Sequence, residues 1–313
     1  MRRSNAMYRL PASGGTASVR PDDLVQVRGD PSMSPMILKY RCQDRPGLVA
    51  AVSNLVFTLK GNITEATQFD DQMTRTFFLR MAFSTSVPEA NLRQDLARLA
   101  SEHGAAFEIK PADRKRKVLI LVSRFDHCLG DLLYRMRIGE LNMECVGVVA
   151  NHPREAMKST SHIGLPFHHL PTTPDSKKQQ EAEIKKIIDE TGAELVILAR
   201  YMQILSDEFA ADLSGRCINI HHSFLPGFKG AKPYHQAHAR GVKMIGATAH
   251  YVTGDLDEGP IIAQDVEQIN HADTPDDMVR KGRDIERRVL ARAVLLHLED
   301  RVFVNGNKTV VFT

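Results

Sequence analysis

Two short, uninterrupted runs of apolar residues constrain the fold of this chain more than any other feature. KVLILVS (117–123) and ELVILA (194–199) lack the alternation of polar and apolar residues that a half-exposed strand shows. Such runs are typical of parallel strands that are buried on both faces of a sheet. ECVGVVAN (144–151) has the same character, and helical patterns over about 127–139 and 176–191 separate the three runs. We therefore predict a mostly parallel α/β sheet with right-handed crossovers.

The pattern continues towards the C-terminus. Further strands are predicted over 217–223, 246–253 and 261–266. A long helix is expected to begin at Thr274-Pro275, because threonine is a good N-cap and proline is favoured at the first helical position. A short strand pair, 301–304 and 309–312, is predicted after this helix.

Residues 36–110 are predicted to form a separate, smaller unit. A strand (36–43) leads through the turn Asp44-Arg45-Pro46-Gly47 into a helix whose apolar residues follow one buried stripe. The remaining elements are expected at 62–69, 75–84, 89–103 and 107–110. The order β-α-β-β-α-β is that of a ferredoxin-like unit. A polar linker, 111–116, then joins it to a second domain over 117–313.

The composition excludes several classes of protein. Residues 1–34 are rich in Arg, Ser, Gly and Pro, and we predict a disordered extension there. The net charge of +3 does not indicate nucleic-acid binding. No apolar run approaches the roughly 18 residues that a membrane helix needs. The four cysteines form no C-x-x-C pair, which favours reduced thiols and a cytoplasmic location.

The stretch INIHHSFLP (218–226) carries the first candidate for chemistry. Side chains alternate along a strand, so Asn219 and His221 point to one face and Ile218 and Ile220 to the other. Open α/β sheets bind ligands at the carboxyl ends of their strands, where these two residues are expected. An amide beside an imidazole can stabilise a developing oxyanion. The alternative is that Asn219 caps a turn and His221 is a hydrogen-bonded interior histidine.

The loop TGDLDEGP (253–260) carries the second candidate. Asp255, Asp257 and Glu258 lie between two glycines, so the loop can bring a carboxylate near a histidine of a neighbouring strand. Such a carboxylate favours the charged imidazole and can accept a proton from water. The alternative is an ordinary polar turn between two strands.

Other catalytic classes lack support in the sequence. Several pairs of histidines occur, but none has the H-E-x-x-H context of a zinc site, and no G-x-S-x-G is present. The loop after the first α/β strand, RFDHCLGDLL (124–133), holds bulky side chains where a phosphate-binding loop would be glycine-rich. We therefore expect neither a catalytic metal nor a phosphorylated co-substrate at that loop.

Four segments together resemble the folate-dependent formyl-transfer family. INIHHSFLP, HYVTGDLDEGPII and ILARYMQIL (197–205) match its motifs, and SRFDHCLGDLLYR (123–135) is most similar to the formyltetrahydrofolate deformylases within it. The N-terminal unit resembles the ACT regulatory domain that precedes the catalytic domain in that group. The resemblance spans about 36–313, and it implies a Rossmann-like formyltransferase domain after an ACT domain.

The resemblance implies a reaction and its residues. The expected activity is hydrolysis of 10-formyltetrahydrofolate to tetrahydrofolate and formate, which supplies formate for one-carbon and purine metabolism, without a cofactor or a metal. The implied catalytic residues are Asn219, His221 and Asp257. The implied substrate-binding residues are Tyr201, Met202, Gln203, Leu205, Val252, Thr253, Gly254, Asp255 and Leu256.

Regulation and other functions stay open at this point. The ACT resemblance implies a homo-oligomer with an amino-acid effector, bound near Asp44, Arg45, Gly47, Leu48 and Asn62. The unit could instead serve oligomerisation alone. Two alternative functions remain: a formyltransferase with an amine acceptor such as glycinamide ribonucleotide, and a non-catalytic regulator that binds folate or an amino acid.

Overall fold

The computed structural model describes residues 33–159, 162–173, 175–227 and 233–313. The N-terminal unit contains β1 (Ser34–Gln43), α1 (Leu48–Thr58), β2 (Asn62–Asp71), β3 (Thr76–Thr85), α2 (Glu89–His103) and β4 (Ala106–Pro111). Its strands form an antiparallel sheet in the order β2-β3-β1-β4. This is the β-α-β-β-α-β arrangement that the sequence predicts.

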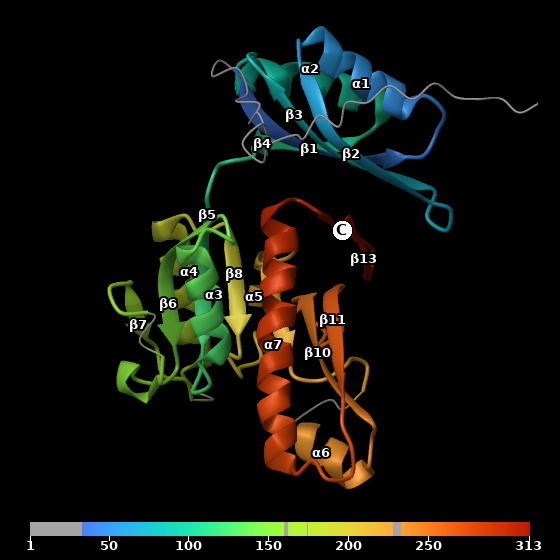
Figure 1. Ribbon diagram of the computed structural model, residues 1–313. Helices are drawn as coiled ribbons and strands as arrows, with labels where there is room; N and C mark the ends of the chain where they lie inside the picture. Colours follow the sequence, from blue (N-terminus) through green and yellow to red (C-terminus); the bar gives the residue numbers. More distant parts are fainter. Residues whose placement is uncertain (1–32, 160–161, 174, 228–232) are drawn as a thin grey trace, which may run out of the picture.

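The strand β1 shows how this unit divides its contacts between two faces. Leu38 and Tyr40 point to the helices and are fully buried in a core with residues of α1 and α2. The alternate residues Lys39 and Arg41 line the opposite face, which looks towards the rest of the molecule (Figure 1). On the same face, the Phe78 ring contacts Phe303 edge-on, with 5.5 Å between ring centroids.

The second unit is built on a seven-stranded sheet in the order β11-β10-β9-β8-β5-β6-β7. Its strands are β5 (Arg116–Val122), β6 (Met143–Ala150), β7 (Phe167–His169), β8 (Leu195–Ala199), β9 (Cys217–His221), β10 (Met244–Tyr251) and β11 (Ile261–Gln268). Five neighbouring strands run parallel, in the order β7, β6, β5, β8 and β9. At the other edge, β10 pairs antiparallel with β9 and with β11. A hairpin of β12 (Val302–Asn305) and β13 (Lys308–Val311) follows.

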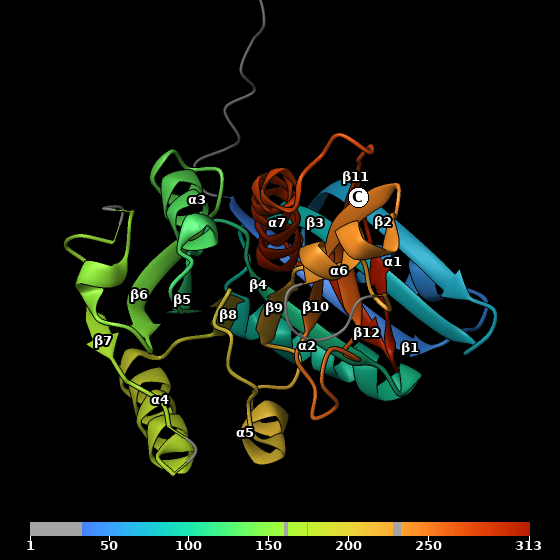
Figure 2. The same cartoon turned by 90° about the horizontal axis from the view of Figure 1, so that it is seen from below.

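Helices cover both faces of this sheet (Figure 2). On one face lie α3 (His127–Arg137), α6 (Pro233–Arg240) and α7 (Pro275–Leu298). On the other lie α4 (Lys177–Thr191) and α5 (Asp207–Asp212). The helix α7 begins with a capping box between Thr274 and Asp277 and has proline at its start, as its sequence predicts. Among the described residues, no helix combines the length and apolarity needed to span a membrane.

Several element ends differ from the sequence-based predictions. The extension predicted over 1–34 lies outside the described residues except at its end, where Ser34 already pairs with Thr85 in β1. The strand predicted over 217–223 ends at His221, and the one predicted over 246–253 runs over 244–251. The predicted linker shrinks to 112–115, because β4 and β5 extend into it.

Four of the described elements were missed entirely: β7, α5, α6 and the 3-10 helix Arg154–Ala156. Each is short, with three to eight residues, so its periodicity is too weak to stand out from the flanking loops.

Candidate active site

The strand β9 places Asn219 and His221 at the carboxyl edge of the sheet. Parallel pairing with β8 fixes the register, in which Asn219 lies opposite Leu198. The residues Ile218 and Ile220 point to the other face, into the core formed with α7. His221 is only 5% exposed although it carries a polar ring. The alternation predicted from the sequence is therefore present, and both polar side chains share one face.

The loop after β10 brings Asp257 against His221. The Oδ1 atom of Asp257 lies 3.2 Å from Nδ1 of His221. Asp257 has a φ angle of 57°, in the left-handed region that non-glycine residues seldom occupy. The loop also requires Gly259, because a Cβ atom there would lie 1.7 Å from the carbonyl oxygen of Tyr251. The loop backbone is thus held in an unusual conformation that directs one carboxylate at the imidazole.

The electrostatics favour a charged carboxylate in this pair. Burial alone would raise the pKa of Asp257, but the hydrogen bond and charge of His221 outweigh burial and lower it. Asp257 is therefore ionised at neutral pH. The other ring nitrogen of His221, Nε2, is buried and has no hydrogen-bond partner among the described residues. Because buried polar atoms are nearly always paired, this nitrogen is available for a ligand.

A second histidine, His250, completes the cluster and was not identified from the sequence. Its Nδ1 lies 2.9 Å from the carbonyl oxygen of Tyr251 and must donate to it. Its Nε2, 3.2 Å from Nδ2 of Asn219, is then the acceptor. Burial lowers the pKa of His250, which favours this neutral form. His250 thereby fixes which end of the Asn219 amide carries the donor hydrogens. The sequence could have identified His250 by its place in the motif HYVTGD, on a strand next to β9.

A small cavity of about 50 Å³ adjoins these side chains. Seven of the nine predicted substrate-binding residues line it: Gln203, Leu205, Val252, Thr253, Gly254, Asp255 and Leu256. The other two lie elsewhere. Tyr201 is 1% exposed and packs in the core beside α4, and Met202 is 52% exposed and lines a different cavity.

That second cavity, of about 270 Å³, lies on the α7 side of the same edge and contains a polar cluster centred on Glu286. Glu286, 1% exposed, accepts hydrogen bonds from Tyr234 Oη and from His127 Nε2, both at 2.7 Å. The Nε atom of Arg200 lies 3.3 Å from the same carboxylate. Burial raises the pKa of Tyr234, which keeps its hydroxyl protonated as a donor. No sequence motif pointed to this cluster, since its members are far apart in the chain.

The same cluster contains the one group of potential metal ligands among the described residues. Donor atoms of His127, Cys128 and Glu286 lie within 4.8 Å of one another. However, the carboxylate of Glu286 already accepts two hydrogen bonds and forms an ion pair with the Arg200 cation. Burial raises the pKa of Cys128 well above its usual range, so the thiol stays protonated. These contacts disfavour a metal ion at this position.

The predicted effector residues lie at the start of the N-terminal unit. Gly47 adopts a φ of 90° and caps α1, and Leu48 is buried in the core. Arg45 donates to the carbonyl oxygen of Glu102 at 3.1 Å. Asn62 is exposed at the start of β2, and the described hydrogen bonds do not join it to the 44–48 loop.

Known proteins share this architecture. The formyl transferase family model matches residues 116–294. Formyltetrahydrofolate deformylase of Corynebacterium sp. (strain P-1) is 49% identical over 278 residues, which cover 88% of this chain and 97% of that protein. The crystal structure of a formyltetrahydrofolate deformylase from Pseudomonas putida KT2440 is 50% identical, with a TM-score of 0.84, covering 89% of this chain and all of that one. The corresponding structure from Burkholderia mallei ATCC 23344 is 51% identical, with a TM-score of 0.85 and coverage of 90% and 100%.

Proposed function

Since the chain belongs to the formyltetrahydrofolate deformylase family, we propose that it hydrolyses 10-formyltetrahydrofolate with Asn219, His221 and Asp257 as catalytic side chains. The products are tetrahydrofolate and formate, and the bond that breaks is the formamide C–N10 bond. The observation that carries this proposal is the buried Nε2 of His221, which lacks a partner beside an ionised Asp257.

The oxyanion is stabilised by two donors. His221 acts here as the imidazolium, in which both ring nitrogens carry hydrogen: Nδ1–H donates to Asp257, and Nε2–H faces the formyl oxygen. One N–H of the Asn219 amide is held by His250, which leaves the second N–H for the same oxygen. Both donors are fixed before substrate arrives, so little reorganisation is needed as negative charge develops.

Asp257 serves as the general base. Its carboxylate accepts a proton from water as the water oxygen forms a bond to the formyl carbon. The tetrahedral intermediate then collapses, the C–N10 bond breaks, and the proton returns to N10. Asp257 is thereby regenerated, and no oxidant, reductant or further reactant is required.

The folate is bound by the loop 252–256 and by the facing residues Gln203 and Leu205. A cavity of about 50 Å³ holds only a few water molecules. Admission of a bicyclic pterin ring therefore requires the loop to move outward. Leu256, with 54% of its surface exposed, is free to move with it.

Water is the acceptor because the loop after β5 does not provide a phosphate site. The carboxylate of Asp126 accepts the backbone N–H of Ser159 at 2.6 Å, which puts a negative charge where a phosphate would lie. The exposed ring of Phe125 adds bulk to this loop. This arrangement disfavours glycinamide ribonucleotide as the formyl acceptor.

We further propose a cytoplasmic homo-oligomer whose ACT unit binds an amino acid near Asp44, Arg45, Gly47, Leu48 and Asn62. The left-handed turn at Gly47 supports an effector site, since it exposes backbone at the start of α1. All four cysteines are free and buried, which supports a reducing compartment. Equilibrium dialysis with amino acids tests the effector, and sedimentation analysis tests the assembly.

The decisive experiment incubates the purified chain with 10-formyltetrahydrofolate and no acceptor. We expect formate and tetrahydrofolate in equal amounts. The matched variant Asn219→Ala should lower kcat by about 10²–10³-fold, the usual loss for one oxyanion donor. Formate transfer only after addition of glycinamide ribonucleotide would identify a transferase instead. Binding of folate without turnover would identify a regulator.

A further inference from the structure

A cavity of about 290 Å³ lies between the N-terminal unit and the second unit. The N-terminal unit contributes Lys39 and Arg41 of β1 and residues 106–108 of β4. The second unit contributes Tyr251, the last turn of α7 and the strand β12. The units are held together beside the cavity, because Arg41 donates to the carbonyl oxygen of Val304 at 3.1 Å.

The charges on the cavity wall do not balance. Lys39, Arg41 and Arg116 face it, against only two carboxylates, Glu108 and Asp300. Burial lowers the pKa of His297 to about 3, so this histidine on the wall is neutral. The wall therefore carries one positive charge more than its carboxylates neutralise.

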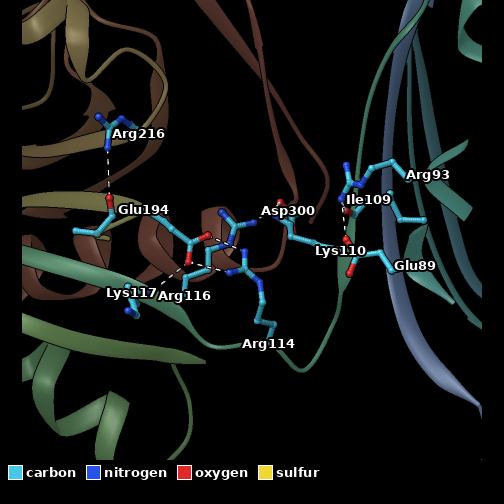
Figure 3. A network of polar contacts seen from close by, with 11 residues as sticks. Glu89, Arg93, Ile109, Lys110, Arg114, Arg116, Lys117, Glu194, Arg216 and Asp300 are labelled. Atoms are coloured by element: carbon cyan, nitrogen blue, oxygen red, sulfur yellow. Dashed lines mark hydrogen bonds and ion pairs between the residues drawn. The ribbon is translucent and has the colours of Figure 1, made fainter. Parts of the chain in front are cut away.

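Asp300 is already engaged by other cations, so it is not available as a close partner for Lys39. Its carboxylate pairs with Arg116 and lies 2.6 Å from the Lys110 ammonium, as Figure 3 shows beside the linker. Asp300 is 3% exposed. Among the described residues, Lys39 and Arg41 are then the wall cations without a carboxylate oxygen at hydrogen-bond distance.

The environment of Lys39 has two parts, one polar and one apolar. The nearest carboxylate oxygen to its ammonium, on Glu108, is 3.9 Å away, beyond hydrogen-bond distance. The ammonium lies over the Phe303 ring, 4.7 Å from its centroid. Burial lowers the pKa of Lys39, which is the effect of removing an ammonium from water without a full set of acceptors. Beside it, Val302 and Phe107 form an apolar wall.

We propose that this cavity is a binding site for a small organic monocarboxylate with an apolar body. One negative charge neutralises the excess on the wall and gives Lys39 the acceptor that it lacks. The apolar part of the ligand packs against Phe303 and its neighbours. A phosphate dianion fits less well, because Glu108 and Asp300 would repel its second charge. This site is separate from the 44–48 loop.

The cavity also adjoins the base of the catalytic loop. Tyr251 lines it, and Tyr251 Oη lies 2.7 Å from Nδ1 of His297, another wall residue. The backbone N–H of Tyr251 donates to the carbonyl oxygen of Pro260 at 2.9 Å, which closes the loop that carries Asp257. A bound carboxylate therefore contacts the residue from which this loop begins, and we expect it to change turnover. This consequence rests on the proposed function, whereas binding does not.

Calorimetric titration of the full chain tests the site. Phenylacetate serves as the charged probe and 2-phenylacetamide as its neutral match. We expect saturable binding of phenylacetate with a Kd on the order of 1 mM, or about −4 kcal/mol, and none for the amide. Lys39→Met removes the ammonium, retains the length of the side chain, and should weaken binding at least about tenfold, or 1.4 kcal/mol. Lys115→Met, at an exposed linker position, should bind as the parent chain does.

Three results would overturn the site: no saturable phenylacetate binding, equal binding of the amide, or undiminished binding by Lys39→Met. Formate release is measured on the same samples. Binding without any effect of phenylacetate on kcat or KM would overturn the link to the catalytic loop and leave the site standing. Binding by a chain that releases no formate would contradict the proposed hydrolysis instead.

Discussion

Two polar clusters lie at the same edge of the large sheet and differ in how the carboxylate of each is held. His221 ends β9 and His222 follows it, and their ring centroids lie 5.4 Å apart, so the two clusters adjoin at this pair. On one side, His221 contacts Asp257 and retains a buried nitrogen without a partner. On the other, His222 lines the cavity next to Glu286, whose carboxylate accepts two hydrogen bonds and forms an ion pair with Arg200.

The difference separates the proposed general base from a carboxylate that we expect to be structural. Asp257 adopts a strained backbone conformation and has room beside it for water and substrate. Glu286 sits within the long helix α7, where the backbone is regular and each carboxylate oxygen already accepts a hydrogen bond. Both carboxylates have a lowered pKa, so the pKa direction alone does not distinguish them. Their backbone conformations do, since Asp257 is left-handed and Glu286 is helical.

The largest expected effect comes from Asp257→Asn. We expect kcat to fall by about 10²–10⁴-fold, because the attacking water loses its proton acceptor. The folded structure should persist, since asparagine is among the few residues that tolerate a left-handed backbone. Formate release and urea unfolding, measured together, check both parts.

A neighbouring carboxylate in the same loop provides the control for this variant. Asp255 lines the substrate cavity, and no described hydrogen bond joins its side chain to His221. Asp255→Asn should therefore alter KM more than kcat. If Asp257→Asn kept near-normal turnover, or if Asp255→Asn lost as much kcat, the assignment of Asp257 as the base would be wrong.

Glu286→Gln should show the opposite pattern. The change leaves the buried Arg200 guanidinium without its carboxylate, and breaking such a pair typically costs about 3–5 kcal/mol. We expect that loss in the free energy of unfolding, measured with urea, while kcat of the folded fraction changes only several-fold. Asp284→Asn serves as the control on the same helix, because its pair with Arg287 is partly exposed and should contribute under about 1 kcal/mol. A large fall in kcat with unchanged stability would move Glu286 into the catalytic machinery.

The sequence predicted the elements with strong patterns and missed contacts that depend on distant residues. The buried runs of β5 and β8 are apolar on both faces, and Thr274-Pro275 is a local helix-start signal, so both could be predicted. The pair of Asn219 and His221 followed from alternation along one strand. The partnership of Glu286 with His127 could not be predicted, because 159 residues separate them and only the assembled sheet brings α3 and α7 together.

The sequence also did not predict which way side chains point outside helices and strands. Tyr201 and Met202 follow β8 directly and belong to a stretch that otherwise lines the substrate cavity. Both Arg200 and Met202 have positive φ angles, of 64° and 60°, which redirect the chain at this point. Tyr201 is thus buried and Met202 turned to the other cavity, an outcome that strand or helix periodicity does not encode.

The smallest expected effect concerns His222 and sharpens the contrast with His221. Burial, followed by the nearby Arg200 charge, lowers the pKa of His222 from 6.5 to about 3. Between these values the unfolded chain binds a proton at this position and the folded chain does not. The histidine therefore makes stability rise with pH, and stability is lost as pH falls below about 6.5, with a limiting slope of about 1.4 kcal/mol per pH unit.

His222→Gln removes this titration, so its unfolding free energy should fall less steeply than that of the parent chain between pH 6 and 4. Urea unfolding at several pH values measures how steeply the unfolding free energy of each chain changes with pH. The carboxylates and His297 contribute equally to this slope in both chains. His235→Gln, at an exposed position on α6, should keep the parental slope. Equal slopes for His222→Gln and the parent would mean that His222 is charged in the folded protein. The cavity beside Glu286 would then contain a charged His222 in addition to Arg200. The proposed division between a reactive and a structural cluster would no longer hold.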